Sequence, residues 1–429
     1  MSFARLAARL HRALLISTSA VVATVAVDFP IHAQAAPKSP IRTLAPSTAV
    51  SKDSVGPLVA IRELSDGSVM LNDPFTRRVL LFDAKLAGAK VVIDTIGGAE
   101  PGAPAKIQQP ALTLIPYLGD STLYADRVSQ SLLVLDANGK VARVMSIPRA
   151  NDIGMMAQWG EAGIPGIDSK GRLIYHGTFS AKPSTRNAEK PWLPPIPQQA
   201  DSSPVVRADF DTRKVDTLVV LKNSLGAPFK SLEEDSDGNV FMRMYINLLG
   251  VDDQFAVLSD GTAAVLSVHD YHLEFADPDR TRRSAPKMPF DWKRLTDADK
   301  QRMRDSVAPD LERRNNVAPI RINTPNGPRT GRQVFEFLPN EKFGDYEQPV
   351  QTAAMRADRD ARLWILPRTS LGAKGGLLYD VINRKGELVE RVQFPPGYVL
   401  AGFGEKGVVY IMKLEKNRGL LERTTVKLD

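Results

Sequence analysis

The chain has no cysteine and only five histidines in 429 residues. Without cysteine there is no disulfide, no lipid-anchored cysteine and no cysteine nucleophile. The G-x-S-x-G elbow of serine hydrolases is also absent. Three histidines follow residue 35, namely His176, His269 and His272, and a continuous strand would point the last two to opposite faces. A three-histidine metal site is therefore not expected.

Strong charge and long apolar runs are also scarce. The formal net charge is only +7, and no basic stretch with interleaved aromatic residues indicates nucleic-acid binding. No segment after residue 35 is long enough to cross a bilayer as a helix. Stability must therefore come from a buried core, and about 390 residues can bury a large one. No cofactor is expected.

Residues 1–35 have the three parts of a secretory signal peptide. Three arginines come first, and Ala13–Val27 is uncharged and mostly apolar. The small residues of a cleavage site follow at Ala33-Gln34-Ala35. An apolar part of about fifteen residues is short for a membrane span of roughly twenty. The sequence therefore predicts export to the periplasm or the medium, with a mature chain that begins near Ala36.

Tight turns with Asp or Asn and Gly recur along the rest of the chain. Such turns accept positive φ and close antiparallel strands. They lie at Asp66-Gly67, Asn138-Gly139, Asp168–Gly171, Asp235–Gly238, Asp260-Gly261 and Asn383–Gly386. Strands that keep returning in this way predict an all-β protein, a β-propeller of four-stranded antiparallel blades.

The predicted strands fall into six units, of which the last has only three strands. Insertions at 180–203, 224–253 and 286–348 interrupt them. Without the insertions each unit has about 46 residues, near the roughly 40–50 of propeller repeats. Ile41–Val50 precedes the first unit and is predicted to supply the missing strand, which closes a six-bladed ring. Residues 36–429 are thus predicted to be one domain, and the protein a monomer.

Three motifs have counterparts in a known group of proteins. Thr95–Gly102 resembles the blade junction of bacterial six-bladed propellers of the NHL/TolB-like kind. Asp252–Gly261 and Leu378–Asn383 resemble blocks in secreted members of that group. The resemblance implies the propeller fold and an extracytoplasmic setting. It implies no catalytic residue, because these motifs are structural.

Residues 296–308 have the pattern of a helix. Thr296 and Asp299 have capping-box spacing, and Pro309 is predicted to end the helix. The helix belongs to the insertion 286–348, between the fourth and fifth blades. We interpret it as a lid or brace, with a docking helix for a partner as the alternative.

The order of connections predicts which loops share a face. In each blade the first-to-second and third-to-fourth turns lie on one face, and the other connections lie on the opposite face. All three insertions fall on this second face, which is therefore the predicted binding face. Trp159, Trp192 and Trp292 lie in its loops, and they either contact a partner or pin the insertions. Trp364 lies within a strand and is predicted to be in the core.

Polar residues at the ends of the second strands point to the same face. These residues are Asp73, Arg77, Asp126, Arg127, His176 and Arg368. Around a ring they either converge on a polar mouth or are unconnected loop charges.

Two apparent ligand motifs are interpreted as turns. Gly402–Gly407 matches G-x-G-x-x-G, but a strand rather than a helix follows it. Glu233–Gly238 resembles half a calcium loop, but its twelfth position is Met244 instead of a bidentate Glu. A weak calcium site there is left open.

Two functions follow as alternatives. The first is an exported propeller that binds a protein partner or small ligand through its insertion-bearing face, without catalysis. It is favoured because no catalytic constellation is recognisable. The second is a hydrolase or lyase with a divalent metal at the central channel mouth.

Overall fold

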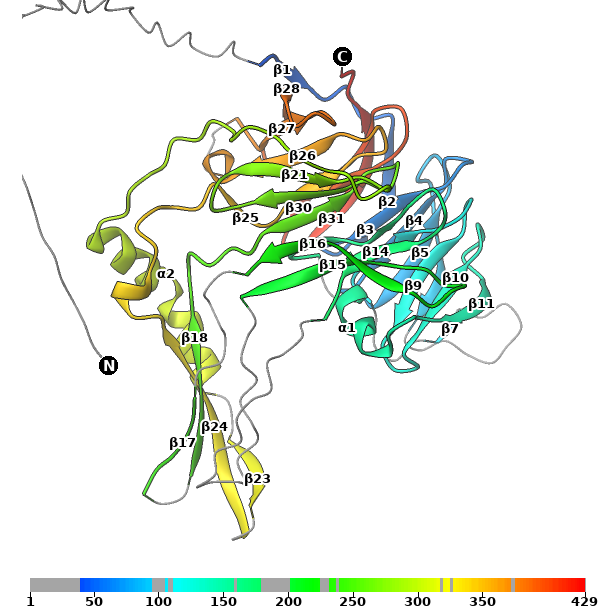
Figure 1. The fold of residues 1–429 in the computed structure, drawn as a ribbon. Helices are drawn as coiled ribbons and strands as arrows, with labels where there is room; N and C mark the ends of the chain where they lie inside the picture. Colours follow the sequence, from blue (N-terminus) through cyan, green and yellow to red (C-terminus); the bar gives the residue numbers. More distant parts are fainter. Residues whose placement is uncertain are drawn as a thin grey trace, which may run out of the picture. The chain divides into compact units, whose positions relative to one another are not determined.

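The computed structural model describes residues 39–94, 105–106, 111–157, 160–178, 201–223, 231–236, 239–316, 319–324, 327–371 and 375–428. Residues 39–429 form one compact unit. In the described part the chain is all-β with few helices, and its strands form seven sheets that are mostly antiparallel (Figure 1). The predicted signal peptide, residues 1–35, lies outside this part.

Six of the sheets are built mainly from consecutive strands. The first contains β3 (Ala60–Glu63), β4 (Val69–Asp73), β5 (Arg78–Phe82), β6 (Ala89–Asp94) and β7 (Ala105–Lys106). The second contains β8 (Ile115–Pro116), β9 (Thr122–Asp126), β10 (Ser131–Leu135) and β11 (Val141–Ser146). The third contains β13 (Gly166–Ile167), β14 (Leu173–His176), β15 (Ser202–Ala208) and β16 (Val215–Lys222).

The next three sheets repeat this plan. The fourth contains β19 (Gln254–Val257), β20 (Ala263–Ser267), β21 (His272–Ala276) and β22 (Arg282–Ser284), with β12 (Gly163–Ile164) beside β19. The fifth contains β25 (Val350–Ala357), β26 (Leu363–Pro367), β27 (Leu378–Ile382) and β28 (Leu388–Gln393), with β1 (Ile41–Thr43) beside β28. The sixth contains β29 (Tyr398–Phe403), β30 (Val408–Glu415), β31 (Arg418–Thr425) and β2 (Ala49–Val55). Successive antiparallel four-stranded sheets of this kind are the organisation of a β-propeller.

The predicted tight turns have the expected backbone conformation. The glycines that adopt φ between 72° and 86° include Gly67, Gly139, Gly171, Gly261 and Gly386. In one such turn Asp136 Oδ1 accepts hydrogen bonds from the backbone N–H of Asn138 (2.9 Å) and Lys140 (2.8 Å). The carboxylate thereby holds the turn closed. The turn at Asp235–Gly238 lies partly outside the described residues.

The N-terminal segment forms two strands, so the prediction of a single strand over Ile41–Val50 is wrong. β1 pairs in parallel with β28, whereas β2 pairs antiparallel with β31. Pro46 lies between them and has no N–H to donate to a sheet, which explains the interruption. The strand that completes the sixth sheet is therefore Ala49–Val55.

The segment Gly163–Ile167 is likewise divided into two short strands. β12 pairs in parallel with β19 of the fourth sheet, while β13 pairs antiparallel with β14 of the third. Pro165 separates them, again because it lacks the N–H that would continue a ladder. One short segment therefore connects two neighbouring sheets.

The seventh sheet is formed by two insertions that are separate in the sequence. Its order is β17 (Ser231–Glu234), β18 (Val240–Ile246), β24 (Gly327–Phe337) and β23 (Ile320–Thr324) (Figure 1). β18 belongs to the insertion 224–253 and β24 to the insertion 286–348, and the two pair in parallel. We call this four-stranded unit the insertion sheet.

The long helix α2 (Asp297–Asn315) packs against the insertion sheet. Its capping box is confirmed, since Thr296 and Asp299 exchange side-chain and backbone hydrogen bonds. Pro309 lies inside the helix, so its predicted role as the end is wrong. Because Pro309 has no N–H, the helix lacks one backbone hydrogen bond there. Contacts between Asn315 and β24 support the last turn. Asn315 Oδ1 accepts from the Phe335 N–H (2.7 Å), and Nδ2 donates to the Phe335 carbonyl (3.0 Å).

Apolar side chains fill the space between neighbouring sheets. One cluster includes Val79, Leu123 and Tyr175, from the first three sheets, and another joins Phe82 and Tyr410, from the first and sixth. Burial of such side chains is the main favourable contribution to folding. Trp364 on β26 is 1% exposed, which confirms its predicted place in the core.

Candidate functional site

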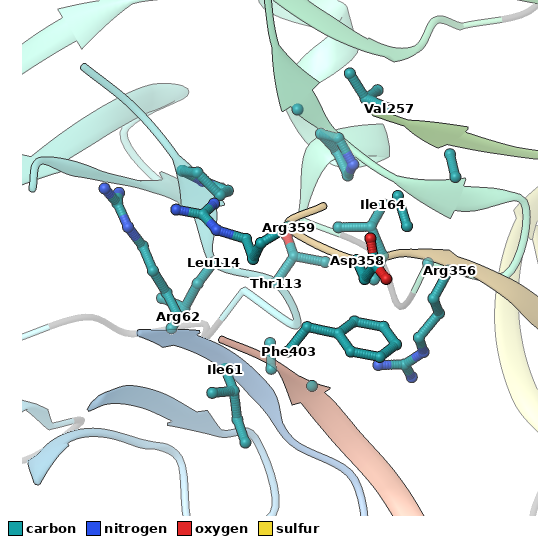
Figure 2. Close-up of a pocket in the computed structure, with 18 of the residues that line it drawn as sticks. Ile61, Arg62, Thr113, Leu114, Ile164, Val257, Arg356, Asp358, Arg359 and Phe403 are labelled. Atoms are coloured by element: carbon teal, nitrogen blue, oxygen red, sulfur yellow. The ribbon is translucent and has the colours of Figure 1, made fainter. Parts of the chain in front are cut away.

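The first strands of the six consecutive sheets contribute to one cavity of about 420 Å³ (Figure 2). Residues of β3, β8, β13, β19, β25 and β29 line it. Ligand sites in proteins are typically concave and largely apolar, with a few polar groups. We therefore take this space, called the central cavity below, as the candidate functional site.

Most of the central cavity wall is apolar, and its charged residues are few. The apolar side chains include Ile61, Leu114, Ile164, Val257 and Phe403. The charged residues are Arg62, Glu63, Arg356, Asp358, Arg359 and Glu405. All six lie near the carboxyl ends of first strands or in the turns that follow them. The charges therefore lie toward the tight turns, away from the insertions.

Arg62 on β3 connects the first sheet to the second through side-chain hydrogen bonds. Its guanidinium donates to the carbonyls of Gly119 (2.7 Å) and Ser121 and to Thr122 Oγ1 (3.0 Å). Burial, and then the nearby positive charge of Arg359, lowers the pKa of Arg62 to about 10. Arg62 is thus chiefly a structural residue whose charge also reaches the central cavity.

Arg359 lies in the turn after β25 and pairs with an acidic residue of the sixth sheet. Its guanidinium is 4.0 Å from a carboxylate oxygen of Glu405, in the turn after β29. The pair links the fifth and sixth sheets at the cavity edge. Both side chains are partly exposed, so this contact contributes little to stability.

Arg356 on β25 differs from the other two arginines. Its guanidinium has no hydrogen bond or ion pair with any residue in the described part of the chain. Burial lowers its pKa, and the polar neighbour Tyr379 acts in the opposite direction. Figure 2 shows the Arg356 and Phe403 side chains pointing toward each other in the cavity. The Arg356 side chain is half-buried. A half-buried cation without a described partner is a favourable place for an anion to bind.

Two of the acidic residues are engaged in structural contacts. Asp358 Oδ2 accepts a hydrogen bond from Trp364 Nε1 (3.0 Å), and Oδ1 accepts from the Arg362 N–H (2.8 Å). Burial raises the pKa of Asp358. Glu63 accepts a hydrogen bond from Tyr410 and lies 3.6 Å from Arg423. These carboxylates therefore do not balance the charge of Arg356.

The predicted mouth residues have local partners. Asp73 is 1% exposed and accepts hydrogen bonds from the N–H groups of Gly56 and Phe75, both at 3.0 Å. Asp126 accepts from the Val128 N–H at 3.1 Å. Both carboxylates stabilise turns.

The other four predicted residues are also outside the central cavity. His176 Nε2 lies 2.7 Å from Ser203 Oγ, and burial lowers the pKa of His176. Arg368 pairs with Glu347 at 3.6 Å. Arg77 adopts φ 61°, and Arg127 is exposed. None of the six second-strand residues lines the cavity.

Trp292 is the one predicted tryptophan of the binding face that the structure describes. Its ring packs edge-on against Phe290 (5.3 Å between centroids) and Tyr346 (6.5 Å). Trp292 is 37% exposed and Tyr346 46%. The contacts tie two parts of the insertion 286–348 together while leaving ring surface accessible. Trp159 and Trp192 lie outside the described residues.

Arg62, Arg356 and Arg359 are not among the predicted site residues, because the predicted binding face is the one that carries the insertions. A signal was nevertheless present. Arg62 and Arg356 are charged residues within the first strands β3 and β25, and the first strands of a propeller are the innermost. A charged residue in such a strand has few places to point except the channel between the blades.

Two further features of the described part concern metal binding and membrane spans. This part contains no group of three or more His, Cys, Asp or Glu side chains placed to hold a metal ion. None of the described helices is both long and apolar enough to span a bilayer.

Comparison with known proteins gives no family. No family model matches the chain, and no curated protein matches it. Solved structures similar to the chain include a streptogramin B lyase, which is 10% identical, with 89% of this chain and 86% of that chain covered and a TM-score of 0.35. A gluconolactonase from Xanthomonas campestris is 10% identical, with coverage of 88% and 86% and a TM-score of 0.37. A luciferin-regenerating enzyme is 9% identical, with coverage of 88% and 93% and a TM-score of 0.37. At these scores the similarity carries no argument, and the activities belong to those proteins.

Proposed function

We propose that this protein is an exported six-bladed β-propeller that binds a small organic anion in its central cavity. The bound molecule has an apolar body, which the apolar wall contacts, and a carboxylate or similar group, which Arg356 binds. This proposal retains the ligand-binding role expected from the sequence but moves it from the insertion face to the central cavity.

The packing of the sheets supports six blades in a closed ring. Buried clusters join the first, second and third sheets, then the third with the fourth, the fourth with the fifth and the fifth with the sixth. A further cluster joins the sixth sheet with the first. In this proposal β2 closes the ring by completing the sixth blade, and the insertion sheet is not a blade.

The unpartnered guanidinium of Arg356 is the observation that carries the ligand assignment. A planar guanidinium binds a carboxylate through two parallel hydrogen bonds. Inside an apolar cavity such a pair is much stronger than in water. An anion would therefore be favoured over a neutral molecule of the same shape.

Calorimetric titration with benzoate and with benzamide tests the assignment, because the two have nearly the same shape and differ in charge. We expect benzoate to bind and benzamide to bind at least about tenfold more weakly, since charge-assisted pairs are the stronger ones. Arg356→Gln should weaken benzoate binding by a similar factor.

Arg127→Gln is the matched control. It removes one positive charge from an exposed site at the end of a second strand. Equal binding of benzoate and benzamide, or full benzoate binding by Arg356→Gln, would overturn the anion site. Loss of benzoate binding only in Arg127→Gln would place the site at the polar residues predicted at the ends of the second strands.

Binding of a partner through the insertion face is the second candidate. The partly exposed row of Phe290, Trp292 and Tyr346 favours it, because exposed aromatic side chains are enriched at interaction hot spots. Trp292→Ala should then weaken partner binding while the melting temperature stays near that of the wild type. A lower melting temperature with unchanged binding would assign Trp292 to pinning the insertion.

Export is part of the proposal. It is supported by the three arginines near the N-terminus, the apolar stretch Ala13–Val27 and the small residues Ala33-Gln34-Ala35. N-terminal sequencing of the protein from its native cell should begin near Ala36. An intact Met1 on the soluble protein would contradict both cleavage and the extracytoplasmic location.

A further inference from the structure

Positive charge is concentrated in one segment of the chain. Residues 313–335 contain five arginines, no lysine and no acidic residue. The net charge of the whole chain is +7, and the three arginines and one aspartate of residues 1–35 reduce it to +5 for the rest. The segment therefore carries an excess equal to the net charge of the mature chain.

This segment forms the end of α2, strand β23 and part of β24. Arg313 pairs with Asp310, and Arg314 lies over the Phe335 ring at 5.8 Å. Arg321, Arg329 and Arg332 have no ion pair or hydrogen bond with another described residue. We call the antiparallel pair β23–β24 with these three arginines the basic hairpin.

The neighbouring strand β18 carries an arginine whose charge is compensated. Arg243 on β18 lies between Glu233 (2.7 Å) and Glu336, so its charge is compensated within the insertion sheet. No carboxylate among the described residues pairs with the arginines of the basic hairpin. Arg321 and Arg332 are exposed, and Arg329 is half-buried. Their charge is therefore directed to solvent.

Strand register shows that the three arginines do not share a face. Arg321 is paired with Thr330, so it shares a face with Arg332, two residues farther along β24. Arg329 is paired with Ile322 on the other face. A ligand in a groove would meet only one face. A broad anionic surface along the outer edge of the hairpin, on the β23 side, can contact arginines from both faces.

We infer that the basic hairpin contacts the surface of an anionic phospholipid bilayer. All its cations are arginines, which bind phosphate oxygens through two parallel hydrogen bonds. Clusters of basic residues bind anionic membranes through such attraction, without crossing them. The inference is independent of the central cavity, which lies among the first strands and not in the insertion sheet.

Vesicle cosedimentation of the mature chain tests this inference. The probes are vesicles of phosphatidylcholine alone and of phosphatidylcholine with phosphatidylglycerol. We expect binding only to the anionic vesicles and a strong decrease in binding at about 0.5 M salt, where charges are screened within a few ångströms. The triple variant R321Q/R329Q/R332Q should bind the anionic vesicles at least about tenfold more weakly than the wild type.

The control variant K85Q/K140Q/K170Q removes the same charge from exposed lysines in tight turns. It should bind anionic vesicles as the wild type does. The single variants R321Q and R332Q provide a second test with a smaller perturbation, and each should weaken binding measurably. Equal loss in the control, unchanged binding by the arginine variants, or no wild-type binding would overturn the inference. Retention on polyglutamate beads without vesicle binding would assign the hairpin to an acidic polymer instead.

Discussion

The indole Nε1 of Trp364 donates a hydrogen bond to Asp358 Oδ2 at 3.0 Å. Trp364 is 1% exposed in the core of the fifth sheet, whereas Asp358 lines the central cavity. Burial raises the pKa of Asp358, so this carboxylate depends on its hydrogen-bond donors. A core residue thus stabilises the turn that also carries Arg359.

Trp364→Phe should therefore destabilise the protein. It keeps an aromatic ring but removes the donor to a buried carboxylate, a loss of about 1–3 kcal/mol in the free energy of unfolding. Urea denaturation measures this change. Trp292→Phe is the control, because Trp292 is 37% exposed and its contacts are ring packing. An equal loss in both variants would contradict a special role for the hydrogen bond.

The two cavity arginines should respond differently to the same substitution. Arg62→Gln removes donors to the carbonyls of Gly119 and Ser121 and should lower the free energy of unfolding by about 1–3 kcal/mol. Arg356→Gln removes a cation without a described partner and should leave stability unchanged or raise it by up to about 1 kcal/mol. Chemical denaturation of both variants without ligand is the measurement. A larger loss in Arg356→Gln would mean that its charge is balanced within the protein.

Truncation should separate the contributions of β1 and β2. A chain that begins at Ala49 loses the Arg42–Glu390 ion pair and the parallel pairing with β28, but keeps β2. A chain that begins at Gly56 also loses the antiparallel pairing with β31 and the buried Val55. We expect the first to fold and the second to aggregate, because the edge of β31 is then exposed. Similar melting temperatures for both would contradict ring closure by β2.

His176 should make stability depend on pH. Burial lowers its pKa below the ordinary value of 6.5, so the unfolded chain binds a proton at a pH where the folded protein does not. Its contribution is therefore complete above pH 6.5 and decreases as the pH falls from there toward the folded-state pKa. His176→Gln should flatten this part of the profile of unfolding free energy. An unchanged profile would show that other groups cause the pH dependence.

Local features of the fold were predictable because short-range chemistry decides them. Gly67 and Gly139 adopt the positive φ that their turns require, and Thr296 with Asp299 forms the expected capping box. Errors occurred where tertiary contacts compete with local preference. Pro309 normally ends a helix, but contacts between Asn315 and Phe335 support another turn.

Sequence alone determined that this is a cysteine-free protein of recurring antiparallel strands, with a signal-like N-terminus and three long insertions. Periodicity and turn chemistry are local and can be read from adjacent residues. Only the tertiary structure decided that two insertions share one sheet and that Arg356 lies in the central cavity without a described partner. The first feature depends on pairing between strands about a hundred positions apart, and the second depends on which charged groups come together in the folded chain. Neither can be read from adjacent residues.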